Sequence, residues 1–208
     1  MAEEKDRVLT KAEQRRMDRF TEVCREMEEK GYKRNDLIID LKKANLVITL
    51  VSIPFTVLSI YLFWAVNRTM APGTLRMIPF LLLLVALTVV HELIHGLAWS
   101  LYCENGWKDI EFGFIVKTMN PYCTCAAPLL KAYYIIGALA PLFVLGVIPY
   151  IAGLFMGNLL VFSLGAVMIL GAGGDIMLVS KLLAFRCEEE EEVVYDHPTE
   201  AGSVMFTR

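Results

Sequence analysis

Long stretches without charge dominate the pattern of apolar and polar positions in this chain. Residues 44–67 and 132–174 contain no Asp, Glu, Lys or Arg, and residues 77–102 contain only Glu92. A helix of about 20 apolar residues crosses roughly 30 Å of hydrocarbon, so the stretch at 132–174 is long enough for more than one crossing. A Gly-Asn pair at 157–158 is its expected break. We predict four transmembrane helices, at residues 44–66, 78–101, 131–155 and 159–185.

The polar segment before the first span has a helical pattern of its own. Thr10 and Glu13 form a capping-box signature, and Gly31 is a stop signal. Between them, apolar side chains recur at helical spacing, at Met17, Phe20, Val23 and Met27. This pattern predicts an amphipathic helix near residues 11–29. Residues 1–43 carry 12 basic and 11 acidic residues, so we expect the helix to pack against the membrane domain or a second subunit rather than to bind lipid as a cationic arm.

Between the second and third spans the apolar pattern changes from helical to alternating. Apolar side chains occur at every second position, at Ile110, Phe112, Phe114 and Val116, before a turn signal at 120–121. The alternation predicts a β-hairpin at about residues 110–126. Its Cys123 and Cys125 have no second cysteine pair at the spacing of a zinc site. We therefore interpret them as reduced, small apolar residues of the hairpin.

Composition indicates the class of protein. Hydrophobic residues make up 56% of the 208 residues, and the mean hydropathy is +0.50, which is too apolar for an ordinary soluble domain. The predicted fold is an all-α membrane protein with about four transmembrane helices, a short β-hairpin between spans two and three and an N-terminal amphipathic helix. Its expected parts are a helical extension at 1–43, a transmembrane domain at 44–186 and an acidic tail at 187–208.

The distribution of basic residues predicts the orientation. Residues 1–43 hold 12 of the 20 Lys and Arg, whereas the loop after the first span holds only Arg68 and Arg76. The positive-inside rule then places the N-terminus in the cytoplasm, and four spans return the C-terminus to the same side. In this topology all five cysteines lie on or near the cytoplasmic side, where thiols stay reduced, so no disulfide framework is expected.

A five-residue motif in the second predicted span carries the chemistry. His91 and His95 are four residues apart and share one face of a helix, which allows both to bind one Zn²⁺. The adjacent Glu92 can reach an activated water as a general base. A carboxylate inside a bilayer costs about 2.5–3.5 kcal/mol on insertion scales and needs a compensating partner, for which a bound cation is suitable.

Two residues compete for the place of a third protein ligand. Asp175 is the only acidic residue of the last apolar span, whereas His197 follows a run of five glutamates in the tail. His91 and Asp175 each lie ten residues from the proposed cytoplasmic end of their span, so both are expected about 15 Å inside at helical rise. We therefore favour Asp175. The alternative is that Asp175 marks a helix break or pairs with Lys181.

These features together resemble a known class of enzyme. The motif in a span, the β segment after it, Ala140-Pro141 in the next span and the glycines before Asp175 are similar to the site-2 protease class of intramembrane zinc metalloproteases. More closely, they resemble a family of small bacterial proteins named putative zincin peptidases. The resemblance covers about residues 40–186. It implies that His91, His95 and Asp175 bind zinc, that Glu92 is the catalytic base and that the hairpin holds substrate in an extended form.

The predicted function is therefore intramembrane zinc-dependent proteolysis of peptide bonds in or near the membrane spans of substrate proteins. A non-catalytic metal-binding scaffold and a small ion or proton transporter remain as alternatives. The absence of an internal repeat in the sequence weighs against a transporter. The expected partners are a membrane protein or peptide substrate and the lipid bilayer, without nucleic acid, and a homo-oligomer stays open. The expected location is the bacterial inner membrane with both termini in the cytoplasm.

Overall fold

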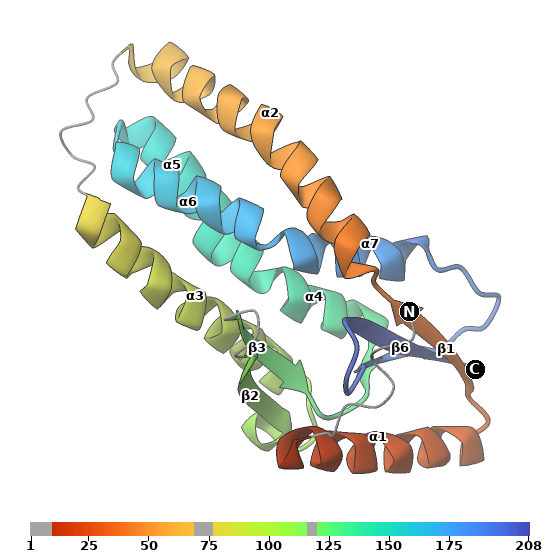
Figure 1. Ribbon diagram of the computed structural model, residues 1–208. Coiled ribbons are helices and arrows are strands. Elements are labelled where there is room, and N and C mark those ends of the chain that lie inside the picture. The colour runs from red at the N-terminus through yellow and green to blue at the C-terminus, as the bar shows by residue number, and fades with distance from the viewer. Residues whose placement is uncertain (1–9, 69–76, 116–119) are drawn as a thin grey trace.

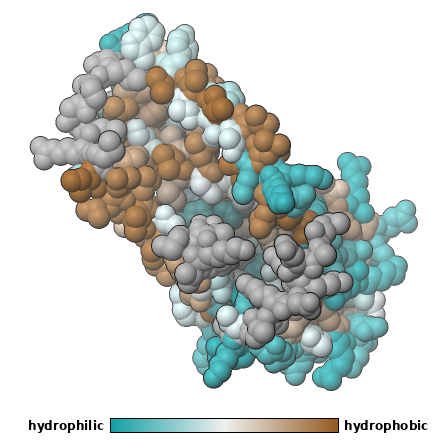
Figure 2. Space-filling model, viewed as in Figure 1, coloured by the Kyte–Doolittle hydropathy of each residue, from teal (hydrophilic) through white to brown (hydrophobic). Residues whose placement is uncertain are grey.

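Apolar helices form one end of the molecule, and a small sheet covered by an amphipathic helix forms the other. The structure, a computed structural model, describes residues 10–68, 77–115 and 120–208. Figure 1 shows the long helices running side by side away from the sheet. In Figure 2, hydrophobic residues gather over the helical end and hydrophilic residues over the other end. Such a division is typical of a protein partly embedded in a bilayer.

Three helices are long and apolar enough to cross a membrane. They are α2 (Leu41–Asn67), α3 (Met77–Ser100) and the segment Lys131–Met156, which consists of α4 (Lys131–Pro141), the wider-turned η3 (Leu142–Val147) and α5 (Ile148–Met156). Helices α6 (Leu159–Gly171) and α7 (Gly173–Ala184) pass the same test as a pair that is bent by 45°. The described chain therefore has three such helices, or four if the bent pair is one span, and the predicted count of four stays a prediction.

Local sequence explains where these helices begin and end. The Asp40 carboxylate accepts hydrogen bonds from the backbone N–H groups of Lys42 and Lys43 and so caps α2. The predicted break at 157–158 is present: Gly157 takes φ 64° after α5, and the Asn158 side chain caps α6. Glycine suits this left-handed position because it has no Cβ.

The amphipathic helix α1 (Lys11–Glu29) begins with a capping box between Thr10 and Glu13. Its apolar residues Phe20, Val23 and Met27 are buried against strands from the C-terminal end of the chain. The apolar face of α1 thus packs on β5 and β6, whereas the sequence had predicted the membrane domain or a second subunit as its partner. The short helix η2 (Gly106–Asp109) follows α3 and leads into the hairpin of β2 (Ile110–Ile115) and β3 (Asn120–Cys125), which pair antiparallel as predicted. Val116, the last residue of the predicted alternation, lies outside the described residues.

The all-α prediction is wrong at the end of the molecule that carries α1 and the C-terminus. A four-stranded antiparallel sheet has the order β1-β6-β5-β4, and its strands are β1 (Lys33–Ile38), β6 (Gly202–Thr207), β5 (Glu192–Asp196) and β4 (Leu129–Leu130). Val194 and Met205 are fully buried against the membrane helices on one face, and Val193 and Phe206 pack under α1 on the other. The predicted solvated tail is therefore structural, because its two short apolar runs are buried on both faces.

His197 stabilises the turn between β5 and β6. Its Nδ1 accepts hydrogen bonds from the backbone N–H groups of Glu200, at 2.9 Å, and Thr199, at 3.4 Å, and its ring lies 5.7 Å from that of Phe20. Only an unprotonated Nδ1 can accept these bonds. Burial lowers the pKa of His197 below its ordinary value of 6.5. The neutral ring is therefore the form that the fold holds.

We expect this turn to make the stability of the protein depend on pH. Because the folded-state pKa of His197 is lowered, its contribution to stability is present above about pH 6.5 and is lost as the pH falls through the folded pKa. In His197→Asn, the amide oxygen can accept the same N–H groups without titrating. Thermal unfolding in detergent from pH 7.5 to 5 should therefore show a smaller loss of stability in the variant than in the wild type. Equal pH dependence of the two proteins would contradict this role of His197.

Candidate metal centre

Three side chains from two helices converge at the candidate site. His91 and His95 lie on one face of α3, and Asp175 lies in the first turn of α7, directly after the bend from α6. The bend accounts for the position of Asp175, because it starts a new helix with a carboxylate near its N-terminus, where the helix dipole favours negative charge. Lys181, the alternative partner of Asp175, instead donates to the backbone carbonyl of Ile38.

The distances among the three side chains suit a small tetrahedral cation. The Nε2 atoms of His91 and His95 are 3.1 Å apart, and they lie 3.2 Å and 3.5 Å from the two carboxylate oxygens of Asp175. With zinc–ligand bonds of about 2.0–2.1 Å, neighbouring ligand atoms of a tetrahedral site are about 3.3 Å apart. Among the described residues, His91, His95 and Asp175 are the one group of three or more His, Cys, Asp or Glu that could hold a metal ion. The residues present therefore fit zinc.

The two histidines are buried, and the aspartate is partly exposed. The side chains of His91 and His95 are 10% and 5% exposed, whereas that of Asp175 is 24% exposed. Buried imidazoles have little access to competing water. Asp175 is therefore the most exposed of the three candidate ligands.

A backbone carbonyl of α4 and an indole of α3 hold His95 in place. Its Nδ1 lies 3.0 Å from the backbone carbonyl of Gly137. Because a carbonyl only accepts, Nδ1 is the donor, and Nε2 keeps the lone pair that a metal needs. The indole of Trp99 stacks on the imidazole, with ring centroids 5.1 Å apart and an interplanar angle of 15°. His95 is therefore fixed both at its edge and at its face.

Glu92 points toward the hairpin. Its carboxylate lies near the backbone N–H of Cys123 in β3. One turn further along α3, the hairpin packs directly on Gly96, where an added Cβ would lie 2.7 Å from Phe112 and 2.9 Å from Ile110. The missing side chain of Gly96 therefore lets the strands approach α3 next to the three candidate ligands. This contact could not be predicted from the sequence, because an isolated glycine in an apolar helix has many explanations.

A buried carboxylate ties the hairpin to α4. Asp196, at the end of β5, accepts hydrogen bonds from the Tyr134 hydroxyl in α4 and from the Cys125 backbone N–H in β3, the latter at 2.9 Å. Burial raises the pKa of Asp196, against the opposing effect of these two donors. The Tyr134 ring in turn stacks on Trp99, which covers His95. Sequence analysis missed Asp196, since it treated the tail as solvated.

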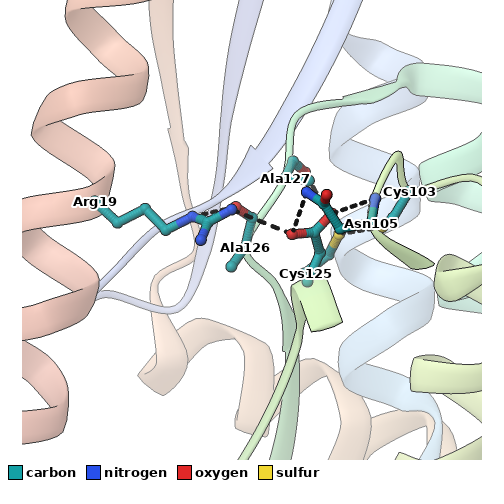
Figure 3. Close-up of polar contacts among 7 residues, drawn as sticks. Arg19, Cys103, Asn105, Cys125, Ala126 and Ala127 are labelled. Carbon is teal, nitrogen blue, oxygen red and sulfur yellow. Dashed lines mark hydrogen bonds and ion pairs between the residues drawn. The ribbon is translucent and has the colours of Figure 1, made fainter. Parts of the chain in front are cut away.

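The start and end of the hairpin are anchored by α1. Asp109, whose side chain is 3% exposed, pairs with Arg19 at 3.2 Å and also accepts from Asn105. The Arg19 guanidinium donates to the carbonyl of Ala126 as well, at 2.8 Å, as Figure 3 shows. The amphipathic helix thus connects the two ends of the hairpin. Replacing Arg19 would leave a buried carboxylate with one partner fewer.

The hairpin cysteines are not part of the three-residue metal group. The Cys125 thiol lies 3.1 Å from that of Cys103, a contact that Figure 3 also draws, and all the cysteines are free thiols. Burial raises the pKa of Cys123 and of Cys125 well above the ordinary range. Because the thiolate is the form that binds metal, such thiols are poor ligands.

The fold and the site define a protein with long apolar helices and a group of two histidines and one aspartate that could bind a metal. The family model described as "Putative zincin peptidase" matches residues 84–188, just over half of the 208 residues. The chain belongs to this family, which implies a metallopeptidase that uses zinc. The matched segment contains His91, Glu92, His95 and Asp175 and excludes α1, α2, β5 and β6. No curated protein and no solved structure matches the chain.

Proposed function

We propose that this protein is an intramembrane zinc metalloprotease of the site-2 protease type, which hydrolyses peptide bonds in or near the membrane spans of other proteins. The observation that carries the proposal is the convergence of the His91, His95 and Asp175 ligand atoms at 3.1–3.5 Å beside Glu92, within long apolar helices. The family, which is one of zinc peptidases, supports the same class of reaction.

Each residue has a role in this mechanism. His91, His95 and Asp175 would hold the ion, which when bound supplies a Lewis acid for the scissile carbonyl and activates a water nucleophile at neutral pH. Glu92 accepts the proton from the attacking water and passes it to the leaving amine. The Glu92 carboxylate lies near the backbone of Cys123 and outside the ligand group, so it stays free to act as the base.

The hairpin is the proposed support for the substrate. A helical substrate span shields its carbonyls in its own hydrogen bonds, so it must unwind before a water can attack. Strand β3 offers an edge for the unwound segment, because Pro121 has no N–H to pair with β2 and the Cys125 N–H donates to Asp196 instead of β2. The backbone of Cys123 lies between them, near Glu92. Strand addition at this edge would hold a peptide extended beside Glu92.

We further propose a location in the bacterial cytoplasmic membrane with both termini in the cytoplasm. Strands β1 and β6 pair along their whole length, so the segment before the first span and the end of the chain lie on the same side. The 12 basic residues before the first span favour the cytoplasm for that side.

The direct test replaces the proposed base while keeping the ligands. Glu92→Gln should keep about one zinc per chain, because Glu92 is outside the ligand group, and should lower cleavage of reconstituted single-span test proteins by about 100-fold or more. Metal content and cleavage are measured on the same preparations. The exposed Glu104, changed to Gln, is the matched control and should leave both unchanged. A zinc-free wild type, or full cleavage by Glu92→Gln, would refute the proposed mechanism, whereas zinc binding without cleavage by the wild type would favour a scaffold.

A further inference from the structure

Pro141 interrupts the hydrogen bonding of α4 at a specific carbonyl. In an α-helix the N–H of residue 141 would donate to the carbonyl of residue 137, but proline has no N–H. The next donor, the N–H of Leu142, goes to the carbonyl of Leu139. Neither residue therefore donates to the Gly137 carbonyl, which is buried inside the apolar segment Lys131–Met156.

The acceptor that Pro141 leaves open is the one that His95 uses. The Gly137 carbonyl accepts the Nδ1–H of His95 at 3.0 Å, across 42 residues of sequence. Both groups are buried, and a buried polar group without a partner is costly, so each one satisfies the other. This bond fixes the tautomer in which Nε2 faces His91 and Asp175.

Gly137 also helps to position His95 in a second way, because it has no side chain. A Cβ at this position would lie 2.0 Å from Cδ1 and 2.1 Å from Nε1 of Trp99. The indole can therefore lie flat against α4 and stack on the His95 ring. Its Nε1–H donates to the Tyr134 carbonyl at 3.0 Å, which fixes the plane of the indole. Gly137 and Pro141 of one helix thus determine both the hydrogen bond at Nδ1 of His95 and the stacking of Trp99 on its ring.

We propose that Pro141 is a positioning residue for the metal centre: its lack of an N–H leaves the Gly137 carbonyl free to orient His95. The inference rests on the proposed function only in taking His95 as a metal ligand. A proline that served only to bend the helix would have no effect on the histidine beyond the general loss of structure. The two roles therefore predict different results when the N–H is restored.

The test is Pro141→Ala, with Pro54→Ala in α2 as the matched control, since Pro54 also lies inside a long apolar helix. Alanine at 141 supplies an N–H that competes for the Gly137 carbonyl and is a better helix former. We expect affinity for Zn²⁺, measured by chelator competition in detergent, to fall about 10-fold, as for other losses of an outer-shell partner. The thermal unfolding midpoint of the metal-free protein should stay equal or rise. Pro54→Ala should bind zinc like the wild type.

A second measurement needs neither zinc nor hydrolysis. The chain has only three histidines, so ¹⁵N-histidine spectra of the metal-free protein can be assigned with single substitutions. His95 should be the Nδ1–H tautomer in the wild type and a mixture of tautomers in Pro141→Ala. Unchanged zinc affinity or an unchanged tautomer in a folded Pro141→Ala would overturn the proposal, as would a loss of affinity that only accompanies unfolding. Because neither readout is cleavage, a failure of the proposed proteolysis would be recognised separately, in the Glu92→Gln comparison.

Discussion

Replacing Asp175 by alanine is expected to remove bound zinc and peptide hydrolysis together. The Asp175 carboxylate is the only acidic member of the three-residue group, and each of its oxygens faces the Nε2 of one histidine at 3.2 Å or 3.5 Å. Without it two neutral imidazoles remain, which is one protein ligand fewer than catalytic zinc sites use. We expect zinc content to fall from about one per chain to near zero after mild chelation, with cleavage lost to background. Metal analysis of the purified protein, alongside cleavage of test proteins, checks both.

The control for this experiment follows from the folded C-terminal strands. Deleting the segment after Arg186 would remove β5 and β6 and expose the core under α1, so a truncation would confuse loss of fold with loss of a ligand. His197→Asn keeps the strands and removes the competing imidazole. It should keep zinc and activity at neutral pH. Full zinc retention in Asp175→Ala combined with zinc loss in His197→Asn would show that His197 is the third ligand.

The sequence could predict the apolar helices and the histidine spacing because both depend on local rules. A bilayer requires long uncharged helices, so the span at 44–66 could be placed within a few residues of α2. Helical periodicity puts His91 and His95 on one face in any helix. The chemistry of the motif did not require knowledge of the tertiary fold. The prediction that Asp175 joins the histidines depended on the equal expected depth of His91 and Asp175 in their two spans. Equal depth does not determine whether the two helices are in contact.

The features that the sequence could not predict depend on contacts between distant segments. Asp196 reaches Tyr134 over 62 residues, and its strand is only five residues long, after a run of glutamates that suggested a solvated tail. The segments that bury such short strands are distant in the sequence, so the local pattern of apolar residues does not predict them. Pro141 was visible in the sequence, and helical geometry alone predicts that it frees the carbonyl of residue 137. That His95 lies opposite this carbonyl could only come from the packing of α3 on α4.

Replacing Cys123 by proline is expected to stop cleavage while zinc stays bound. In β3, Pro121 and Cys123 are two residues apart, so their backbone nitrogens face the same edge, and Pro121 shows that the strand accepts proline there. The substitution removes the Cys123 N–H, which lies near the Glu92 carboxylate and is proposed to pair with an extended substrate. We expect cleavage to fall by about 100-fold or more, because the base and the peptide are both misplaced. Zinc content should be unchanged, since the ligand group is carried by α3 and α7.

Cys123→Ala separates the backbone from the side chain in this experiment. Alanine keeps the N–H and removes the thiol that packs near Gly96, at 3.4 Å from the position of an added Cβ. If the edge of β3 orients Glu92 and the substrate, Cys123→Ala keeps most of the activity and Cys123→Pro does not. Equal loss of activity in both variants would assign the effect to packing of the thiol. Loss of zinc in both would mean that Cys123 binds the metal, against its raised pKa and its place outside the ligand group.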